Sequence, residues 1–270
     1  MTPDQFNSNA QFVHIEERDG FSIVRLIRAT KRNAVNRAMR VELLEVFEVI
    51  RDRYSVCILT GEENSFCAGV DLKEYNEDVE KGIAFDPQTD WARVILAFRD
   101  HPCIFIAAVN GFALGGGITL INACDLAVAA KDAPLGLPEM GFATYPTLAG
   151  PSTQFTLPRK IAAWLILTAN RFDGTTAERW GLVNAAVEAE DLMSVAASWA
   201  ERISKFDSIA LAESKKALDA IPLTITNWKQ AFDFAEGVNA RIEQLSRASA
   251  IGANKIRVGK SSATQGSSPK

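Results

Sequence analysis

The sequence predicts an α/β fold followed by a helical C-terminal part. Short β-type runs alternate with helical patterns in residues 12–61, and the same order returns in residues 103–130. The run Cys-Ile-Phe-Ile-Ala-Ala-Val at 103–109 is apolar throughout, as a strand buried on both faces of a parallel sheet requires. After about residue 195 helical patterns follow one another with few strands.

The same patterns place the individual elements. Two strands are predicted within residues 12–28, and single strands at 55–61, 103–111, 126–130 and 182–187. Helices are predicted at 37–52, 114–123, 161–170, 175–181, 191–206, 208–221 and 224–247. The chain is thus expected to have an α/β core at 1–195, a helical subdomain at 196–256 and a Gly/Ser-rich, disordered tail at 257–270.

Composition narrows the classes of function. Apolar residues make up 47% of the 270, which is enough for a full core. The net charge of −4 gives no basic excess that would neutralise a phosphate backbone, so no nucleic-acid partner is expected. No apolar run approaches ~18–20 residues, and the N-terminal residues show no targeting pattern. The protein is therefore expected in the cytoplasm and not in a membrane.

Residue types that bind metals or act as nucleophiles are scarce. The four cysteines are not spaced as paired zinc ligands or as a dense disulfide framework, and they are predicted to be small apolar core residues. Two histidines and the lack of a G-x-S-x-G sequence leave little for a Ser–His–Asp hydrolase or a multi-histidine metal site. Carboxylates, hydroxyls and backbone groups remain for the chemistry, without a metal.

Two segments share one design, in which a β-type run ends in a glycine-containing turn that opens a helix. They read CILTGEENSFCAGVDLKEY at 57–75 and IAAVNGFALGGGITL at 106–120. Backbone N–H groups at a helix start are unpaired and carry the positive end of the helix dipole, so two such turns facing each other would form an oxyanion hole. Close helix–strand packing is the simpler explanation for either turn alone. A dinucleotide fingerprint fits poorly, because Ala113 stands where its second glycine belongs.

One carboxylate stands out downstream, Glu139 in APLGLPEMGFATYP. Its sequence neighbours are apolar, and a desolvated carboxylate has a raised pKa that suits a general acid or base. The alternative is a solvated loop glutamate.

Three segments carry a family resemblance: FCAGVDLKEY at 66–75, VNGFALGGG with ACDLAVAA at 109–130, and APLGLPEMG with YP at 133–146. With the stretch LPRKIAAWLILTANRFDGTTAERWGLVNAAV at 157–187, they resemble the enoyl-CoA hydratase/isomerase (crotonase) family from about Phe12 to Arg247. The resemblance implies a crotonase-like spiral of ββα units and a C-terminal helical subdomain that forms trimers, often paired into hexamers. It also implies an acyl-CoA thioester substrate, with coenzyme A present only as part of that substrate and no separate cofactor.

The resemblance assigns roles to particular residues. The thioester oxygen would accept hydrogen bonds from the backbone N–H groups of Val70 and Gly116, and Glu139 would transfer protons. The segment Ala68 to Lys73 would pass the adenine end of coenzyme A, with Lys73, Lys31 and Arg32 as phosphate contacts or, alternatively, as solvated charges. Asp71 and Asp125 match family positions and are interpreted as capping or turn-fixing residues. The remaining candidates for contact with the substrate are Tyr75, Gly115, Thr119 and Tyr145.

The chain departs from the family where typical hydratases carry a first glutamate, because Thr119 stands there. Two carboxylates hold and activate the water in hydration, whereas one carboxylate suffices for moving a double bond. Thr119 is expected to be a packing residue or, alternatively, to hold a water. A second departure, YPTLAGPSTQF in place of a Pro-Gly-rich turn, predicts a reshaped pocket wall around residues 145–151.

Tyr75 and the single retained glutamate also resemble the hydroxycinnamoyl-CoA hydratase-lyases, whose tyrosines bind a phenol. The partner tyrosine of that subgroup is missing, since the helix NWKQAFDFAEG offers only Phe232 and Phe234. Two alternatives therefore stay open beside enoyl-CoA hydratase/isomerase chemistry: hydratase-lyase cleavage of a C–C bond, and a catalytically weak CoA-binding oligomer.

Overall fold

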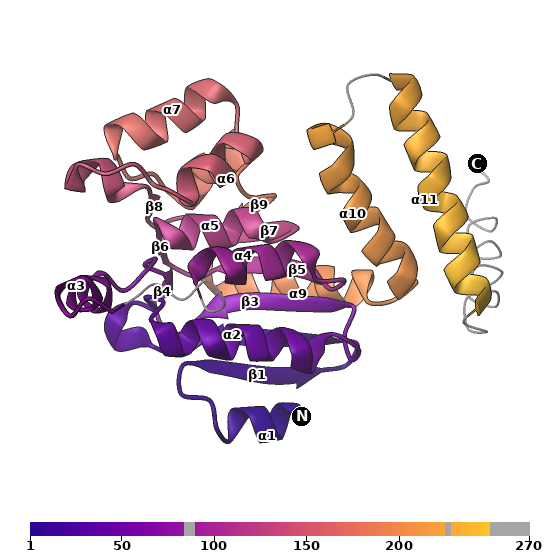
Figure 1. Cartoon of the computed structure of the whole chain (residues 1–270), viewed down its shortest axis with the longest axis horizontal. Coiled ribbons are helices and arrows are strands. Elements are labelled where there is room, and N and C mark those ends of the chain that lie inside the picture. The colour runs from indigo at the N-terminus through magenta and orange to yellow at the C-terminus, as the bar shows by residue number, and fades with distance from the viewer. Residues whose placement is uncertain (84–89, 225–227, 249–270) are drawn as a thin grey trace, which may run out of the picture. The chain divides into compact units, whose positions relative to one another are not determined.

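The computed structural model describes residues 1–83, 90–224 and 228–248, so the tail predicted at 257–270 lies outside the described residues (Figure 1). The chain divides into two compact units, Met1–Ile203 and a second that begins at Ser204, whereas the sequence pattern placed the boundary at 195/196. Each unit is described by itself. In the described ranges no helix is long and apolar enough to cross a membrane.

The first unit contains a six-stranded sheet in the order β1-β2-β3-β5-β7-β9. Its strands are β1 (Val13–Arg18), β2 (Phe21–Leu26), β3 (Val56–Gly61), β5 (Ile104–Val109), β7 (Leu126–Ala130) and β9 (Ala185–Val187). β1 runs antiparallel to β2, and every other pair is parallel. The predicted α/β fold and these strands are confirmed.

A second, three-stranded parallel sheet has the order β4-β6-β8. Its strands are β4 (Ser65–Cys67), β6 (Phe112–Leu114) and β8 (Leu135–Gly136), which are too short to leave a periodic pattern in the sequence. The helix predicted to begin at residue 114 begins at Gly116, because Leu114 pairs with Gly136 in this sheet.

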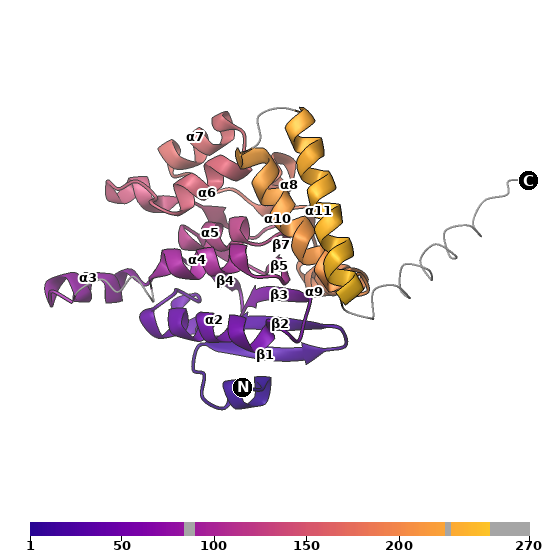
Figure 2. The ribbon, with the colours of Figure 1, turned by 45° about the vertical axis from the view of Figure 1, so that its right-hand side comes forward.

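Helices surround the two sheets. They are α1 (Pro3–Asn7), α2 (Arg37–Ile50), α3 (Leu72–Glu80), α4 (Trp91–Asp100), α5 (Gly116–Ala123), α6 (Ala149–Thr156), α7 (Arg159–Thr168), α8 (Gly174–Trp180) and α9 (Leu192–Ile203), with 3₁₀ turns η1 (Ala29–Lys31), η2 (Pro138–Phe142) and η3 (Ala189–Asp191). α3 buries none of its residues and stands apart from the large sheet in Figure 2.

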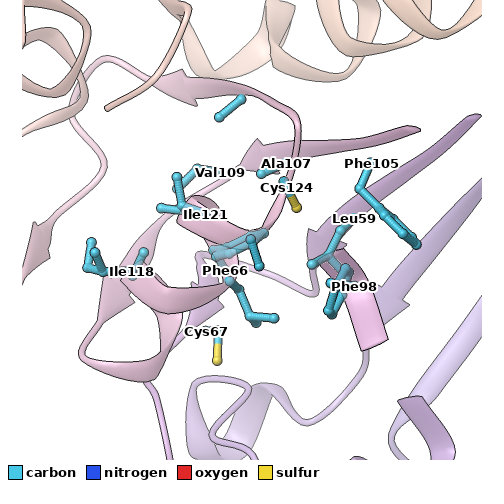
Figure 3. Close-up of a cluster of buried hydrophobic side chains, with 14 of the residues drawn as sticks. Leu59, Phe66, Cys67, Phe98, Phe105, Ala107, Val109, Ile118, Ile121 and Cys124 are labelled. Carbon is cyan, nitrogen blue, oxygen red and sulfur yellow. The ribbon is translucent and has the colours of Figure 1, made fainter. Parts of the chain in front are cut away.

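The strands β3, β5 and β7 are buried on both faces, which explains their continuous apolar sequences. On one face Ile58, Ile106 and Val128 pack with the apolar side of α9. On the other face Leu59, Phe105 and Ala107 share one cluster with Phe98 of α4 and Ile121 of α5 (Figure 3). Helix α5 is therefore packed against the sheet.

The four cysteines are buried core residues, as the sequence predicted. Burial raises the pKa of the Cys57 and Cys67 thiols to about 12, so both are neutral core groups.

The second unit contains α10 (Ser208–Thr224) and α11 (Trp228–Ala248) in its described part. Glu213 of α10 bonds Arg241 of α11 at 3.0 Å and Lys216 on its own helix at 2.6 Å. These two bonds lower the pKa of the Glu213 carboxyl.

Candidate active site

The two glycine turns predicted from the sequence meet in the structure. Gly69 has φ +90°, and a Cβ placed on it would lie 2.9 Å from the backbone nitrogen of Gly116. A Cβ placed on Gly116 would lie 3.1 Å from Gly69 Cα and 3.4 Å from the backbone nitrogen of Val70. The backbone nitrogens of Val70 and Gly116, which the sequence analysis assigned as donors, are thus close neighbours.

The main chain around Val70 is oriented by a single parallel bridge to Val35. Val35 N–H donates to Gly69 O at 2.7 Å, and Asp71 N–H donates to Val35 O at 3.0 Å. Because neighbouring amides of an extended chain alternate in direction, the Val70 N–H points away from Val35. Neither Val70 N–H nor Gly116 N–H donates a hydrogen bond to any residue that the structure describes.

Each of the three consecutive glycines has its own steric reason. Gly115 has φ +51°, and a Cβ there would lie 2.6 Å from Glu139 Oε1. Gly116 faces Gly69, as described above, and a Cβ on Gly117 would lie 2.0 Å from the carbonyl oxygen of Cys67. Gly115 thus lies close to a carboxylate, Gly116 to the other glycine turn, and Gly117 to strand β4.

Glu139 lies in η2 with its carboxylate against Gly115. Its Oε2 atom is buried and has no hydrogen-bond partner, and burial raises the pKa of the carboxyl. The sequence argument attributed this desolvation to apolar neighbours, but of these Phe142 is 65% exposed. The structure instead places the Glu139 carboxylate beside the glycines of α5.

Thr119 is only 1% exposed and lies inside α5, one turn after Gly115. Its hydroxyl donates a long hydrogen bond of 3.5 Å to Gly115 O. This contact with its own helix favours the packing alternative for Thr119.

Asp71 begins α3 as its N-cap residue and accepts from Lys73 N and Glu74 N at 3.0 and 3.3 Å. Its other oxygen pairs with Arg28 at 2.7 Å. Burial opposes ionisation, but the bonds from Arg28 and the two N–H groups outweigh it, so the pKa of the Asp71 carboxyl is lowered. Asp125 in turn accepts from Phe105 N at 2.8 Å, at the start of β5.

The predicted contacts for coenzyme A lie around the Gly69 turn. Ala68 N–H donates to Arg32 O at 2.9 Å, which joins the end of η1 to this turn. The Arg32 guanidinium stacks 4.5 Å from the centre of the Phe112 ring, and Lys31 is exposed. Lys73 lies on the exposed surface of α3 with Nζ 3.8 Å from Glu77.

Two predicted tyrosines are exposed at the surface. Tyr75 is 56% exposed on α3. Tyr145 is exposed in the segment after η2, and its hydroxyl accepts from Gln154 Nε2 at 2.8 Å. Both remain predicted substrate contacts.

Comparison with known proteins identifies the fold and family. The family model for enoyl-CoA hydratase/isomerase matches residues 16–241. This chain belongs to the enoyl-CoA hydratase/isomerase family.

The mevalonyl-coenzyme A hydratase of Aspergillus fumigatus is 34% identical over 82% of this chain and 88% of its own length. The hydroxycinnamoyl-CoA hydratase-lyase of Pseudomonas fluorescens is 31% identical over 75% and 76% of the two chains. The crystal structure of enoyl-CoA hydratase from Bacillus anthracis superposes with a TM-score of 0.76 at 28% identity, covering 89% of this chain and 96% of that one.

The family predicted from the sequence is confirmed, and with it the crotonase fold and an enzyme that acts on acyl-CoA. In this enoyl-CoA hydratase/isomerase family member, the described residues contain no cluster of three or more His, Cys, Asp or Glu side chains able to hold a metal ion.

Sequence reasoning missed one residue at the site, Trp91 at the first position of α4. Its side chain is 6% exposed, and its Nε1 lies 3.1 Å from the Cβ position of Gly116. The only local signal is the preceding N-cap, Asp90, and the proximity of Trp91 to Gly116 arises from the packing of α4 beside α5.

Proposed function

We propose that this enzyme stabilises the enolate of an acyl-CoA thioester with the N–H groups of Val70 and Gly116, and that Glu139 moves the protons. One observation carries the proposal: two backbone N–H groups that donate no hydrogen bond to a described residue lie close to a buried carboxylate whose Oε2 atom has no hydrogen-bond partner. Preorganised donors of this kind act on charge as it develops, and the removal of one typically costs about 10²–10³ in rate. The buried carboxyl of Glu139, with its raised pKa, is the stronger base that α-proton removal needs.

Double-bond migration needs no further group. Glu139 removes a proton from C2 of a 3-enoyl-CoA, the electron pair moves into the thioester as a dienolate, and the two N–H groups bind its oxygen. The protonated Glu139 then returns a proton to C4, which gives the 2-enoyl-CoA. One carboxylate is both base and acid, and no atom is gained or lost.

Hydration of a 2-enoyl-CoA uses the same groups with a water added. Glu139 takes a proton from the water as the water oxygen attacks C3, the enolate forms at the same N–H pair, and the protonated Glu139 then delivers a proton to C2. Relatives named as hydratases, among them the Aspergillus enzyme and the 2,3-dehydroadipyl-CoA hydratase of Escherichia coli at 30% identity, support testing this reaction alongside migration.

Coenzyme A would enter only as part of the substrate, with no separate cofactor. Lys31, Arg32 and Lys73 are the proposed contacts for its phosphates. Lys73 follows the Gly69 turn closely in sequence, and Arg32, which is next to Lys31, is joined to the turn by a backbone hydrogen bond. The predicted cytoplasmic location stays a prediction.

We also propose, from the family resemblance, that the α10–α11 unit mediates a trimer or hexamer. The two helices border an open, mainly apolar groove of about 500 Å³ lined by Ser214, Ala217, Leu218, Ile221, Pro222, Ala235, Val238 and Asn239. Light scattering tests the assembly, since three or six chain masses support it and a single mass contradicts it.

The test of the proposed chemistry is incubation with short-chain and aromatic 2-enoyl-CoA and 3-enoyl-CoA, followed by mass and absorbance. Glu139→Gln is the variant, and Glu190→Gln, an exposed glutamate in η3, is the matched control. Migration or hydration that is lost with Glu139→Gln and kept in the control supports the proposal and shows which reaction runs. Release of an aldehyde would point to the hydratase-lyase alternative. Tight acyl-CoA binding without turnover, unaffected by Glu139→Gln, would overturn the proposal in favour of a binding oligomer.

A further inference from the structure

The indole of Trp91 carries a buried donor without an acceptor. Trp91 is 6% exposed, and its Nε1 has no hydrogen-bond partner among the residues that the structure describes. Buried polar groups are nearly always satisfied in native structures, so an exception in a candidate active site calls for an explanation. Among the other buried side-chain atoms in this condition is Glu139 Oε2, which belongs to the same site.

The position of this donor is defined by Gly116. A Cβ built on Gly116 would lie 3.1 Å from Trp91 Nε1 and 3.4 Å from Val70 N. The indole nitrogen and one of the two proposed oxyanion donors therefore both border a single methyl-sized space, which Gly116 leaves open. The other proposed donor is the amide of Gly116 itself.

We propose that the indole N–H of Trp91 is a third hydrogen-bond donor to the thioester oxygen, and that it acts mainly on the enolate. This inference rests on the proposed function. A thioester carbonyl oxygen has two lone pairs, which Val70 and Gly116 occupy in the bound substrate, whereas an enolate oxygen has three. A third donor therefore binds the enolate more strongly than the ground state, which is the condition for raising kcat.

A purely structural role for Trp91 makes a different prediction. The ring of Trp91 belongs to the apolar cluster that packs against the sheet, and phenylalanine would fill most of that volume. If packing were the only role, Trp91→Phe would affect every ligand alike, because the variant removes the N–H and keeps an aromatic ring. Selective loss for an enolate is expected only if the N–H bonds its oxygen.

The experiment compares two ligands on the full chain, acetoacetyl-CoA, which ionises to an enolate with its own absorbance band, and butyryl-CoA, which does not. Trp91→Phe is compared with wild type and with Trp164→Phe, a control on α7 whose ring packs against Trp180. We expect Trp91→Phe to lose about tenfold in affinity for acetoacetyl-CoA and in the amplitude of the enolate band, with butyryl-CoA affinity within twofold of wild type. On the substrate that wild type turns over, kcat should fall about tenfold with KM nearly unchanged.

The outcomes separate this inference from the function on which it rests. Wild type that forms no enolate band with acetoacetyl-CoA refutes the oxyanion hole and Trp91 together. An enolate band that is retained in Trp91→Phe refutes the role of Trp91 alone, and so does an equal loss of both ligands.

A second measurement, on wild type, covers the case in which Trp91→Phe does not fold. The ¹⁵N-labelled protein has five indole N–H resonances, and that of Trp91 can be assigned by replacing the other four tryptophans in turn. The Trp91 resonance should move downfield with acetoacetyl-CoA and much less with butyryl-CoA. Equal movement with both ligands, or none, overturns the proposal.

Discussion

Gly116→Ala tests the geometry of the proposed oxyanion hole with one methyl group. The variant places a Cβ 3.1 Å from Gly69 Cα, 3.1 Å from Trp91 Nε1 and 3.4 Å from Val70 N. The methyl would therefore stand beside both proposed backbone donors, in the space that the thioester oxygen needs. Gly116 is the first residue of α5 and does not have a positive φ, so alanine suits its backbone conformation.

The expected magnitudes for stability and rate differ widely. Restricting the unfolded chain favours alanine by about 0.4–1 kcal/mol, and contacts just above 3 Å oppose it by a similar amount, so the melting temperature should change by less than about 4 °C. Loss of one oxyanion donor costs about 2.7–4 kcal/mol of transition-state stabilisation, which is about 10²–10³ in kcat. Gly116→Ala should therefore be a folded enzyme that is at least about a hundredfold slower.

The assay is kcat and KM on the best enoyl-CoA substrate, with thermal unfolding and binding of free coenzyme A measured on the same preparations. Gly237→Ala in α11 is the matched control, since among the residues that the structure describes its new Cβ meets only the Arg241 guanidinium, at 3.7 Å. A Gly116→Ala enzyme within about threefold of wild type would refute the assignment of this space to the thioester oxygen. A large loss of melting temperature would show instead that the methyl disrupts the meeting of the two turns.

Three further changes test the residues around this space. Glu139→Gln should abolish turnover and stabilise the protein by about 1 kcal/mol, or roughly 2–4 °C, at pH 8, because it removes a buried charge that lacks a partner. Burial raises the folded-state pKa of Glu139, so the stability of wild type is lowered only when this group is ionised. The difference in melting temperature between Glu139→Gln and wild type should therefore vanish below the ordinary pKa of glutamate. For the same reason kcat/KM of wild type should begin to fall on the acid side at a higher pH than an unperturbed glutamate would give. Thr119→Val should keep kcat/KM within about threefold of wild type, because the hydrogen bond that Thr119 donates to Gly115 O is long and weak. A selective loss of hydration activity would show instead that Thr119 holds the water. Asp71→Ala should lower the free energy of unfolding in urea by about 2 kcal/mol, because the helix cap and the ion pair with Arg28 are both lost. This loss should become smaller as the pH falls through the lowered pKa of Asp71. A change below about 0.5 kcal/mol would contradict the prediction.

The elements with many periodic residues could be predicted from the sequence, and the short ones could not. β5 is six consecutive buried residues, and that run is visible as an uninterrupted apolar stretch. β8 is two residues long and is defined by its pairing with β6, which is a contact over more than twenty positions of sequence. The predicted start of α5 was two residues too early for this reason. Leu114 has a helical local pattern, but in the structure it belongs to β6 and pairs with Gly136 of β8.

The site shows the same division between local and long-range information. The two glycine turns could be identified because each ends a strand of a parallel sheet, and the C-terminal ends of such strands lie on one edge. For Glu139 the direction of the pKa shift was predicted correctly but from the wrong neighbours, because the Glu139 carboxylate is buried against Gly115 and not among Met140 and Phe142. Trp91 has no local signal, since its role follows from the packing of α4 beside α5.

Backbone donors and side chains contribute differently to this site. The positions of the Val70 and Gly116 N–H groups depend on the Val35 bridge and on glycines that admit close approach, so the side chain of Val70 has no part in presenting its N–H. Such a hole polarises any acyl-CoA thioester and cannot by itself choose between adding water, moving a double bond and cleaving a C–C bond. In the proposed mechanism that choice falls to the side chains around the hole, and among the described residues these include one carboxylate, a threonine bonded to its own helix and an indole N–H without a partner. A site with one carboxylate has a single place to store the substrate proton, and an added donor to the enolate lengthens the life of the intermediate while the proton is held there. If the proposed roles of Glu139 and Trp91 hold, the arrangement therefore favours returning a proton to a second carbon over holding a water with two acids.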